Sequence, residues 1–131
     1  MALAACYRIL VASNTTRITS LLFNPHGPSG PSLDATSQTV VGTQPMWVTG
    51  HPTNPSLAFT GLEQDDGMAI ALSYDDTGKG TIVGEIPSGG AVATFLLATT
   101  DALFVANVRR MPSKLLCARG TLFADPVRRR G

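Results

Sequence analysis

The sequence predicts an all-β fold, and two observations favour it over a helical one. Glycine and proline are frequent, with 13 and 9 of the 131 residues, whereas the helix formers Glu, Lys and Gln are sparse. Short apolar or alternating runs are separated by Gly, Pro, Asn and Asp, which turns favour. Each run has the length of a strand, and none has the length of a stable helix.

Nine strands are predicted. The turn residues between them include a Gly/Pro-rich stretch at 24–31, a Pro-rich stretch at 51–55 and the Asp-Gly turns at 65–67 and 75–78. In chain order the predicted strands are Cys6–Ser13, Arg17–Phe23, Leu33–Val41, Pro45–Thr49, Leu57–Gly61, Met68–Tyr74, Thr81–Ile86, Val92–Ala98 and Ala102–Ala106.

The predicted strands also repeat. The segments Leu10–Ser13, Ala58–Gly61 and Phe104–Asn107 each place two apolar residues before two small or polar ones, with starts 48 and then 46 residues apart. A period of 40–50 residues with four strands in each is typical of the blades of a β-propeller. We therefore predict a partial β-propeller of about two four-stranded antiparallel blades over residues 1–107. A chance echo within a small β-sandwich is the alternative.

The charge is divided unevenly between the two parts of the chain. Residues 1–107 carry three basic and eight acidic side chains, a net charge of −5, whereas residues 108–131 carry seven basic and one acidic, a net charge of +6. The sequence therefore predicts a basic, irregular and disordered tail over 108–131. A changed reading frame or a retained intron would explain it. The alternative is a basic segment that contacts nucleic acid.

Part of the chain resembles a known family. Gly42–Thr53, Leu57–Glu63 and Gly67–Gly90 are similar to the first blades of the seven-bladed lactonase propellers, which include 6-phosphogluconolactonases and muconate lactonising enzymes. The resemblance covers Tyr7–Asn107 and implies an N-terminal fragment, about a third of a family member. It departs from the family at Thr43 and Gln44, where relatives often have histidine. The next blade also breaks off at Val108.

Six residues are candidates for the face that would bind substrate, because the turns of a propeller gather at one end of its channel. Glu63, Asp65 and Asp66 can act as a general base or hold a metal, or form only a solvated turn. Trp47 can stack on a substrate ring or pack between blades. We expect no catalytic role for His51, which would lie at the other end. The six candidates are Gln44, Trp47, Glu63, Asp65, Asp66 and Asn107.

The resemblance implies hydrolysis of a sugar lactone in carbohydrate metabolism, but most of the propeller is missing. We expect this fragment to be inactive by itself; the alternative is a non-enzymatic binding or interaction module. Cys6 and Cys117 have no metal-ligand spacing, so we expect no metal site, and we expect no cofactor. We expect a cytoplasmic protein, because the sequence shows no signal peptide. We expect no membrane segment and no nucleic-acid partner. Uncovered blade faces make self-association an expected property.

Overall fold

The computed structural model of the protein describes residues 5–109, which form nine β-strands and no helix. The prediction of an all-β fold is thus confirmed for this part of the chain, where no helix is long and apolar enough to cross a membrane. The strands are β1 (Tyr7–Val11), β2 (Arg17–Asn24), β3 (Ser32–Val40), β4 (Pro45–Gly50), β5 (Leu57–Leu62), β6 (Met68–Tyr74), β7 (Gly80–Pro87), β8 (Ala91–Ala98) and β9 (Leu103–Arg109).

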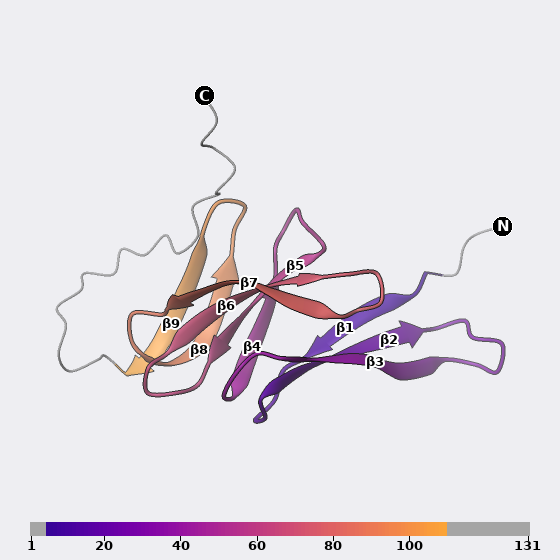
Figure 1. Ribbon diagram of the computed structural model, residues 1–131. Coiled ribbons are helices and arrows are strands. Elements are labelled where there is room, and N and C mark those ends of the chain that lie inside the picture. The colour runs from indigo at the N-terminus through magenta and orange to yellow at the C-terminus, as the bar shows by residue number, and fades with distance from the viewer. Residues whose placement is uncertain (1–4, 110–131) are drawn as a thin grey trace.

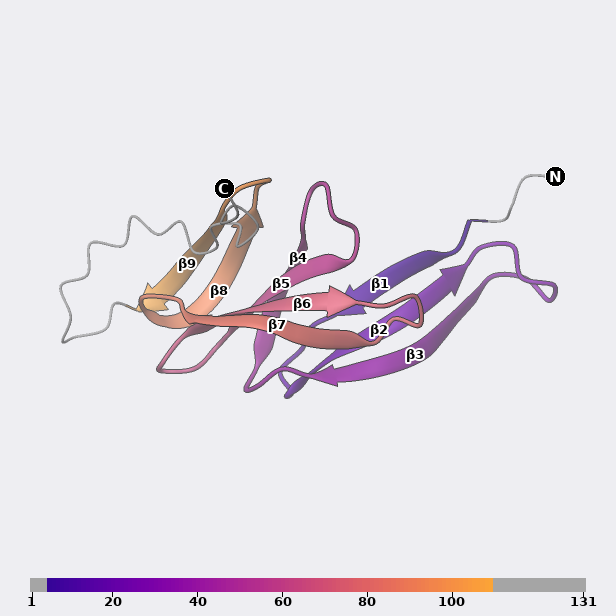
Figure 2. The ribbon, with the colours of Figure 1, turned by 45° about the horizontal axis from the view of Figure 1, so that its top comes forward.

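The strands form three antiparallel sheets, each made of strands that follow one another in the chain. Sheet 1 has the order β1-β2-β3, sheet 2 has β4-β5-β6-β7 and sheet 3 has β8-β9. Figures 1 and 2 show the sheets side by side in chain order, with sheet 2 between the other two. Two faces must therefore be distinguished in each sheet. We call the face turned toward the following sheet the forward face, and the opposite one the backward face.

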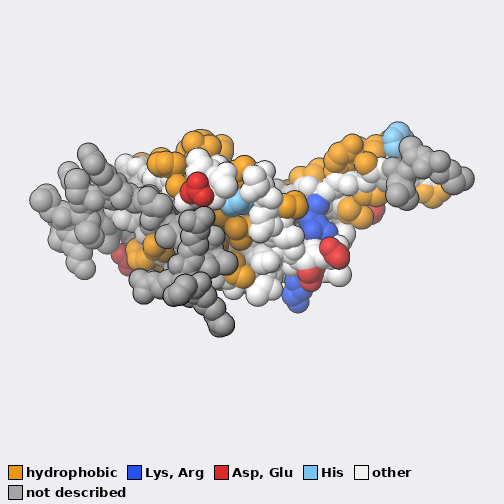
Figure 3. Space-filling view, turned by 90° about the horizontal axis from the view of Figure 1, so that it is seen from above, with side chains coloured by type: hydrophobic (Ala, Val, Ile, Leu, Met, Phe, Trp, Pro, Cys, Tyr) orange, Lys and Arg blue, Asp and Glu red, His pale blue; other side chains and the backbone are white. Residues whose placement is uncertain are grey.

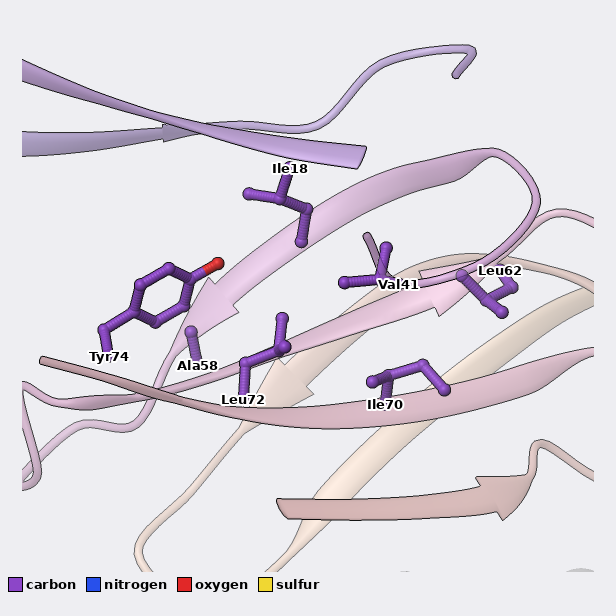
Figure 4. Packing of buried hydrophobic residues seen from close by; sticks show 7 residues of the cluster. All are labelled: Ile18, Val41, Ala58, Leu62, Ile70, Leu72 and Tyr74. Carbon is purple, nitrogen blue, oxygen red and sulfur yellow. The ribbon is translucent and has the colours of Figure 1, made fainter. Parts of the chain in front are cut away.

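A first core joins sheets 1 and 2. Ile18, on the forward face of sheet 1, is fully buried against side chains of β5 and β6, and Leu10 packs at its side. Figure 4 shows Ile18 pointing toward Leu72, with Tyr74 at one end of the cluster and Leu62 at the other. The remaining buried members are Val41, Ala58 and Ile70. Because apolar burial is the main favourable term in folding, this cluster holds the first two sheets together.

A second core joins sheets 2 and 3 and is built from smaller residues. Phe59, Ala69 and Ala71, on the forward face of sheet 2, pack against Leu96 and Leu103 of sheet 3. The backbones approach closely at Gly61, where an added Cβ would lie 2.8 Å from the Ala93 carbonyl oxygen and 2.8 Å from the Leu96 side chain. Only glycine fits this crossing without a shift of its neighbours.

Polar contacts add to the first core at the turn between β6 and β7. The buried Ser20 hydroxyl donates a hydrogen bond to the Gly78 carbonyl (2.6 Å), and the Ser37 hydroxyl donates to the same oxygen (2.5 Å). The Arg8 guanidinium donates to two other carbonyls of this turn, at 2.8 and 2.7 Å. Side chains of sheet 1 therefore bind the backbone of the turn in sheet 2. Arg8 has a structural role in this contact.

Asp75 shapes that turn. Its carboxylate accepts hydrogen bonds from the Thr77 hydroxyl (2.6 Å), the Thr77 amide (2.9 Å) and the Lys79 amide (3.0 Å). The Thr77 hydroxyl and then the Lys79 amide stabilise the charged form, and they hold the pKa of Asp75 below its usual range. Arg8 contributes a further, smaller attraction. The segment Asp75–Lys79 thus stabilises its own turn through local hydrogen bonds, in addition to the contacts from sheet 1.

The connections between sheets repeat the same backbone hydrogen bonds. The Gln44 amide donates to the Thr15 carbonyl (2.7 Å), and one repeat later the Val92 amide donates to the Gln64 carbonyl (2.9 Å). In each case the start of a sheet's first strand is tied to a loop of the preceding sheet, the β1–β2 loop of sheet 1 and the β5–β6 loop of sheet 2. The connection between sheets 1 and 2 is thus built in the same way as the connection between sheets 2 and 3.

These bonds correct the register of the repeat expected from sequence. Thr15 and Gln64 accept the equivalent bonds, so the residues that precede them by the same number of positions correspond to each other. Leu10 therefore corresponds to Phe59 rather than to Ala58. Leu10 and Phe59 both lie on forward faces, whereas Ala58 faces backward into the first core. A slip of one residue turns a strand over, because successive side chains of a strand point to opposite faces.

The C-terminal boundary also differs from the one expected. β9 runs to Arg109, and Ala91 of β8 pairs with Arg109, so Val108 and Arg109 belong to a strand rather than to the predicted tail. The remaining residues of that tail, 110–131, lie outside the described residues.

The phenol of Tyr74 predicts how stability responds to alkaline pH. Its hydroxyl is buried and makes no well-formed hydrogen bond within residues 5–109, although the Thr39 side chain is close enough to interact with it. Burial raises the pKa of Tyr74 above its ordinary value of 10.0, and Thr39 offsets part of that rise. The folded protein therefore holds this proton more tightly than the unfolded chain, so stability should fall as pH rises above about 10.

Tyr74→Phe should remove this part of the alkaline loss. At pH 7 the variant should be as stable as the wild type or slightly more so, because an unsatisfied buried hydroxyl is lost. Urea unfolding at pH 7 and pH 11 tests both statements, with Tyr7→Phe as the control, since Tyr7 is 56% exposed. Equal alkaline losses in the wild type and Tyr74→Phe would contradict the assignment.

Candidate functional site

The loops that connect the strands meet at one end of the three sheets. The Glu63 amide donates to the Gln44 carbonyl (3.0 Å), and the Gly67 amide donates to the Gly90 carbonyl (3.1 Å). Together with the repeated bonds described above, these contacts join the segments 13–16, 41–44, 63–67 and 88–92, which we call the loop end. Asn107, near the end of β9, also reaches this end through Ser88. Five of the six predicted candidates lie at or beside the loop end.

Gln44 is held by its neighbours on both sides. Its side-chain amide donates a hydrogen bond to the Asn14 side chain, and its carbonyl accepts from the Glu63 amide. The Gln44 side-chain amide is therefore bonded to the β1–β2 loop of sheet 1. Gln44 bridges the first two sheets at the loop end, a role that its position in the sequence did not reveal.

The acidic candidates form a turn. Asp65 and Asp66 are exposed, Glu63 is half-buried, and the Gln64 side chain donates to the Asp66 carbonyl (2.9 Å), which closes the turn locally. Within residues 5–109 no three His, Cys, Asp or Glu side chains gather to hold a metal ion. The geometry therefore favours the solvated turn among the alternatives that the sequence left open.

Asn107 and Ser88 form the most buried polar pair of the loop end. The Ser88 hydroxyl donates to Asn107 Oδ1 (2.6 Å), and Asn107 Nδ2 donates to the Ser88 carbonyl (3.0 Å). Ser88 is only 6% exposed. Its backbone amide donates to the Gly67 carbonyl (2.8 Å). Two elements of sheet 2 and one strand of sheet 3 are thus joined at a single serine.

Trp47 packs on another aromatic ring. Its ring centroid lies 4.7 Å from that of Phe95, with the planes inclined at 48°. Both side chains are partly open, with 39% of Trp47 and 45% of Phe95 exposed. Each ring directly follows the shift of register near the start of its strand, so the two hold equivalent places in successive first strands. The contact supports packing between sheets, which was one of the two predicted roles of Trp47.

His51 lies at the opposite end of the strands from the loop end. Its Nδ1 accepts from the amides of Thr53 (3.2 Å) and Asn54 (3.1 Å), which leaves Nε2 to donate to the Thr100 carbonyl (3.2 Å). These partners assign the neutral tautomer that carries its proton on Nε2. The ring connects a turn of sheet 2 to a turn of sheet 3 and is structural.

Backbone strain occurs at two equivalent positions. Gln44 has φ 52° and Val92 has φ 60°, both in the left-handed region that side chains rarely adopt. The strain is greater for Val92, because a β-branched side chain clashes with its own backbone in this conformation. Both residues donate the backbone bond that ties one sheet to the preceding one. The connection therefore imposes the strained conformation.

Comparisons of this chain with protein-family models, with curated proteins and with solved structures found no match.

Sequence reasoning placed most of the candidates at the loop end but did not reveal which neighbours form hydrogen bonds with them. Asn14 and Gln64 adjoin the predicted turns, and their amide side chains were a visible signal. Ser88 lies in a Pro-Ser-Gly-Gly turn that gives no hint of burial, and Phe95 lacks any signal apart from its place one repeat after Trp47. Contacts between sheets therefore decide which polar groups remain free.

Gly67→Ala should destabilise the loop end. A Cβ there would clash with the Ser88 hydroxyl oxygen and lie 2.5 Å from the Gly90 carbonyl oxygen, both of which are held by hydrogen bonds. The expected loss is about 1–3 kcal/mol, as for overpacked sites. Gly50→Ala is the matched control, because no atom lies within 4 Å of its added Cβ. Urea unfolding measures both, and equal losses would contradict the close contact.

Val92→Gly should stabilise the protein. Glycine relieves a left-handed strain of about 1–2 kcal/mol but costs about 0.5–1 kcal/mol in backbone entropy and loses the half-buried Val92 side chain, so a net gain below about 1 kcal/mol is expected. Val105→Gly is the control, since Val105 packs on the second core in a regular strand and its loss should destabilise. Thermal unfolding separates the two, and a lower Tm for Val92→Gly would contradict the strain.

Proposed function

We propose that the chain supplies about two blades of a lactonase-type β-propeller. Sheet 2 is one complete blade of four strands, sheet 1 is the last three strands of the blade before it, and sheet 3 is the first two strands of the blade after it. The single observation that carries this proposal is the pair of bonds from Gln44 to Thr15 and from Val92 to Gln64. A connection that recurs from sheet to sheet is the basis of radial repetition.

The burial of sheet 2 supports the same proposal. Its backward face is covered by sheet 1 and its forward face by sheet 3, so a central sheet has buried side chains on both faces. A strand that is apolar on both faces needs a neighbour on each, as a blade inside a ring has.

The closed propeller would hydrolyse a sugar lactone through attack of water on the ester carbonyl, and the blades in this chain do not catalyse that step alone. A general base must be free to take a proton from that water. At the loop end, however, Gln44, Ser88 and Asn107 are bonded to protein partners. Glu63 is half-buried, and within residues 5–109 it belongs to no group of three His, Cys, Asp or Glu side chains that could hold a metal ion.

The basic side chains support the lack of turnover. A phosphorylated lactone would need cations that converge on its phosphate. Arg8 is bonded to the turn between β6 and β7, and Arg17 donates to the Gln38 side chain (2.9 Å). Water is the only co-substrate of this hydrolysis, so the proposal needs no cofactor. Cys6 is an exposed free thiol, which accords with a cytoplasmic protein.

The full chain should not accelerate lactone hydrolysis. With 6-phosphogluconolactone or unphosphorylated gluconolactone, proton release followed in a pH-stat should equal the spontaneous rate in buffer. Glu63→Gln should give the same trace as the wild type. A saturable rate that is present in the wild type and reduced in Glu63→Gln would overturn the proposal and make Glu63 the general base.

A further inference from the structure

Among residues 5–109, the two outer sheets each keep one apolar face that no other described strand covers. On the backward face of sheet 1, Tyr7 is 56% exposed, Ile9 40%, Val11 39% and Leu33 56%. Figure 3 shows hydrophobic side chains gathered along the part of the surface that sheet 1 forms. On β1, Leu10 points the other way and is partly buried against the first core, so this strand carries apolar side chains on both faces.

Internal equivalence shows what kind of surface fits this face. Thr16 and Gly67 accept equivalent bonds, from the amides of Val41 and Ser88, so β2 and β6 can be aligned. Leu21 and Phe23 of sheet 1 then hold the places of Leu72 and Tyr74 in sheet 2. Leu72 and Tyr74 are covered by the forward face of the preceding sheet. The uncovered face of sheet 1 is therefore shaped to receive a forward face.

Sheet 3 carries an uncovered forward face. Phe104 is 55% exposed and Leu97 is 52% exposed, and the two are direct partners in the register of β8 and β9. Gly61 pairs with Trp47, and Ala106 pairs with Phe95, so Phe104 holds the place of Phe59 in sheet 2. Phe59 is only 5% exposed, because sheet 3 covers it. Sheet 3 thus exposes a forward face of the kind that would cover the backward face of sheet 1.

We propose that this chain assembles head to tail with a second copy of itself, the forward face of sheet 3 in one copy packing on the backward face of sheet 1 in the next. This inference rests on the proposed function, in which the sheets are blades. The contact continues the internal interfaces, because it joins a forward face to a backward face as both existing cores do. It is heterologous, so repetition closes a ring or extends a filament.

Sedimentation velocity of the full chain at several concentrations tests the assembly. The wild type should sediment as oligomers whose mass grows with concentration. Ile9→Glu spoils the backward face of sheet 1 and Phe104→Lys spoils the forward face of sheet 3, so each variant alone should be a monomer. Both side chains are exposed, at 40% and 55%, so neither change disturbs a core. A wild type that stays monomeric at about 100 μM would overturn the proposal, because that concentration lies well above a micromolar dissociation constant.

Mixing the two variants gives the sharper result. Ile9→Glu keeps an intact forward face and Phe104→Lys keeps an intact backward face, so an equimolar mixture should form a one-to-one dimer and nothing larger. A symmetric contact of sheet 1 with sheet 1 would instead leave Phe104→Lys self-associating and the mixture without a new species. Non-specific aggregation would give no dimer of fixed stoichiometry. Either outcome overturns the head-to-tail contact.

Controls keep the two proposals apart. Val83→Glu changes an exposed apolar side chain of β7 (58% exposed), which belongs to sheet 2 and so to neither of the two uncovered faces, and it should associate like the wild type. Leu33→Glu, on the same face as Ile9, replaces Ile9→Glu if circular dichroism shows that variant unfolded. A folded β-protein that never associates overturns the assembly but leaves the blades intact. Lactone turnover by the monomer overturns the proposed function instead.

Discussion

The middle sheet cannot be stable unless both of its faces are covered, and most of the structure follows from this constraint. Ile70 and Leu72 point backward and Phe59 and Ala71 point forward, so the same strands supply two cores. A single sheet with apolar side chains on both faces exposes too much apolar surface to fold alone. Sheets 1 and 3 are therefore as necessary to sheet 2 as its own hydrogen bonds.

The connections between sheets carry that constraint from one sheet to the next. Because each first strand begins with a bond to the previous loop, the angle between neighbouring sheets is set at a backbone contact and then fixed by side-chain packing. This backbone contact has an energetic cost at Val92, which adopts a left-handed conformation that is unfavourable for valine. At the loop end Ser88 and Asn107 form hydrogen bonds with each other, so these polar groups are already engaged within the protein.

The cores also explain why the surface is unusual. Sheet 2 shows what a covered face looks like, and the outer faces of sheets 1 and 3 have the same apolar character without the cover. Isolated exposed apolar residues are ordinary on protein surfaces, but Ile9 and Val11 lie in one row with Tyr7. The backward face of sheet 1 resembles the covered backward face of sheet 2, and the forward face of sheet 3 resembles the covered forward face of sheet 2. This resemblance is the basis of the proposed head-to-tail assembly.

The sequence by itself determined the fold class, the nine strands and the turns between them, because the alternation of apolar residues and the chemistry of Asp-Gly turns and Gly/Pro-rich stretches act over a few residues. It also placed Gln44, Glu63 and Asn107 near one another through the order of the strands. Only the tertiary structure decided that Phe59 rather than Ala58 matches Leu10, since the face of a strand depends on the sheet that packs against it. It likewise decided that Gln44 and Asn107 are bonded within the protein, because their partners lie in other sheets.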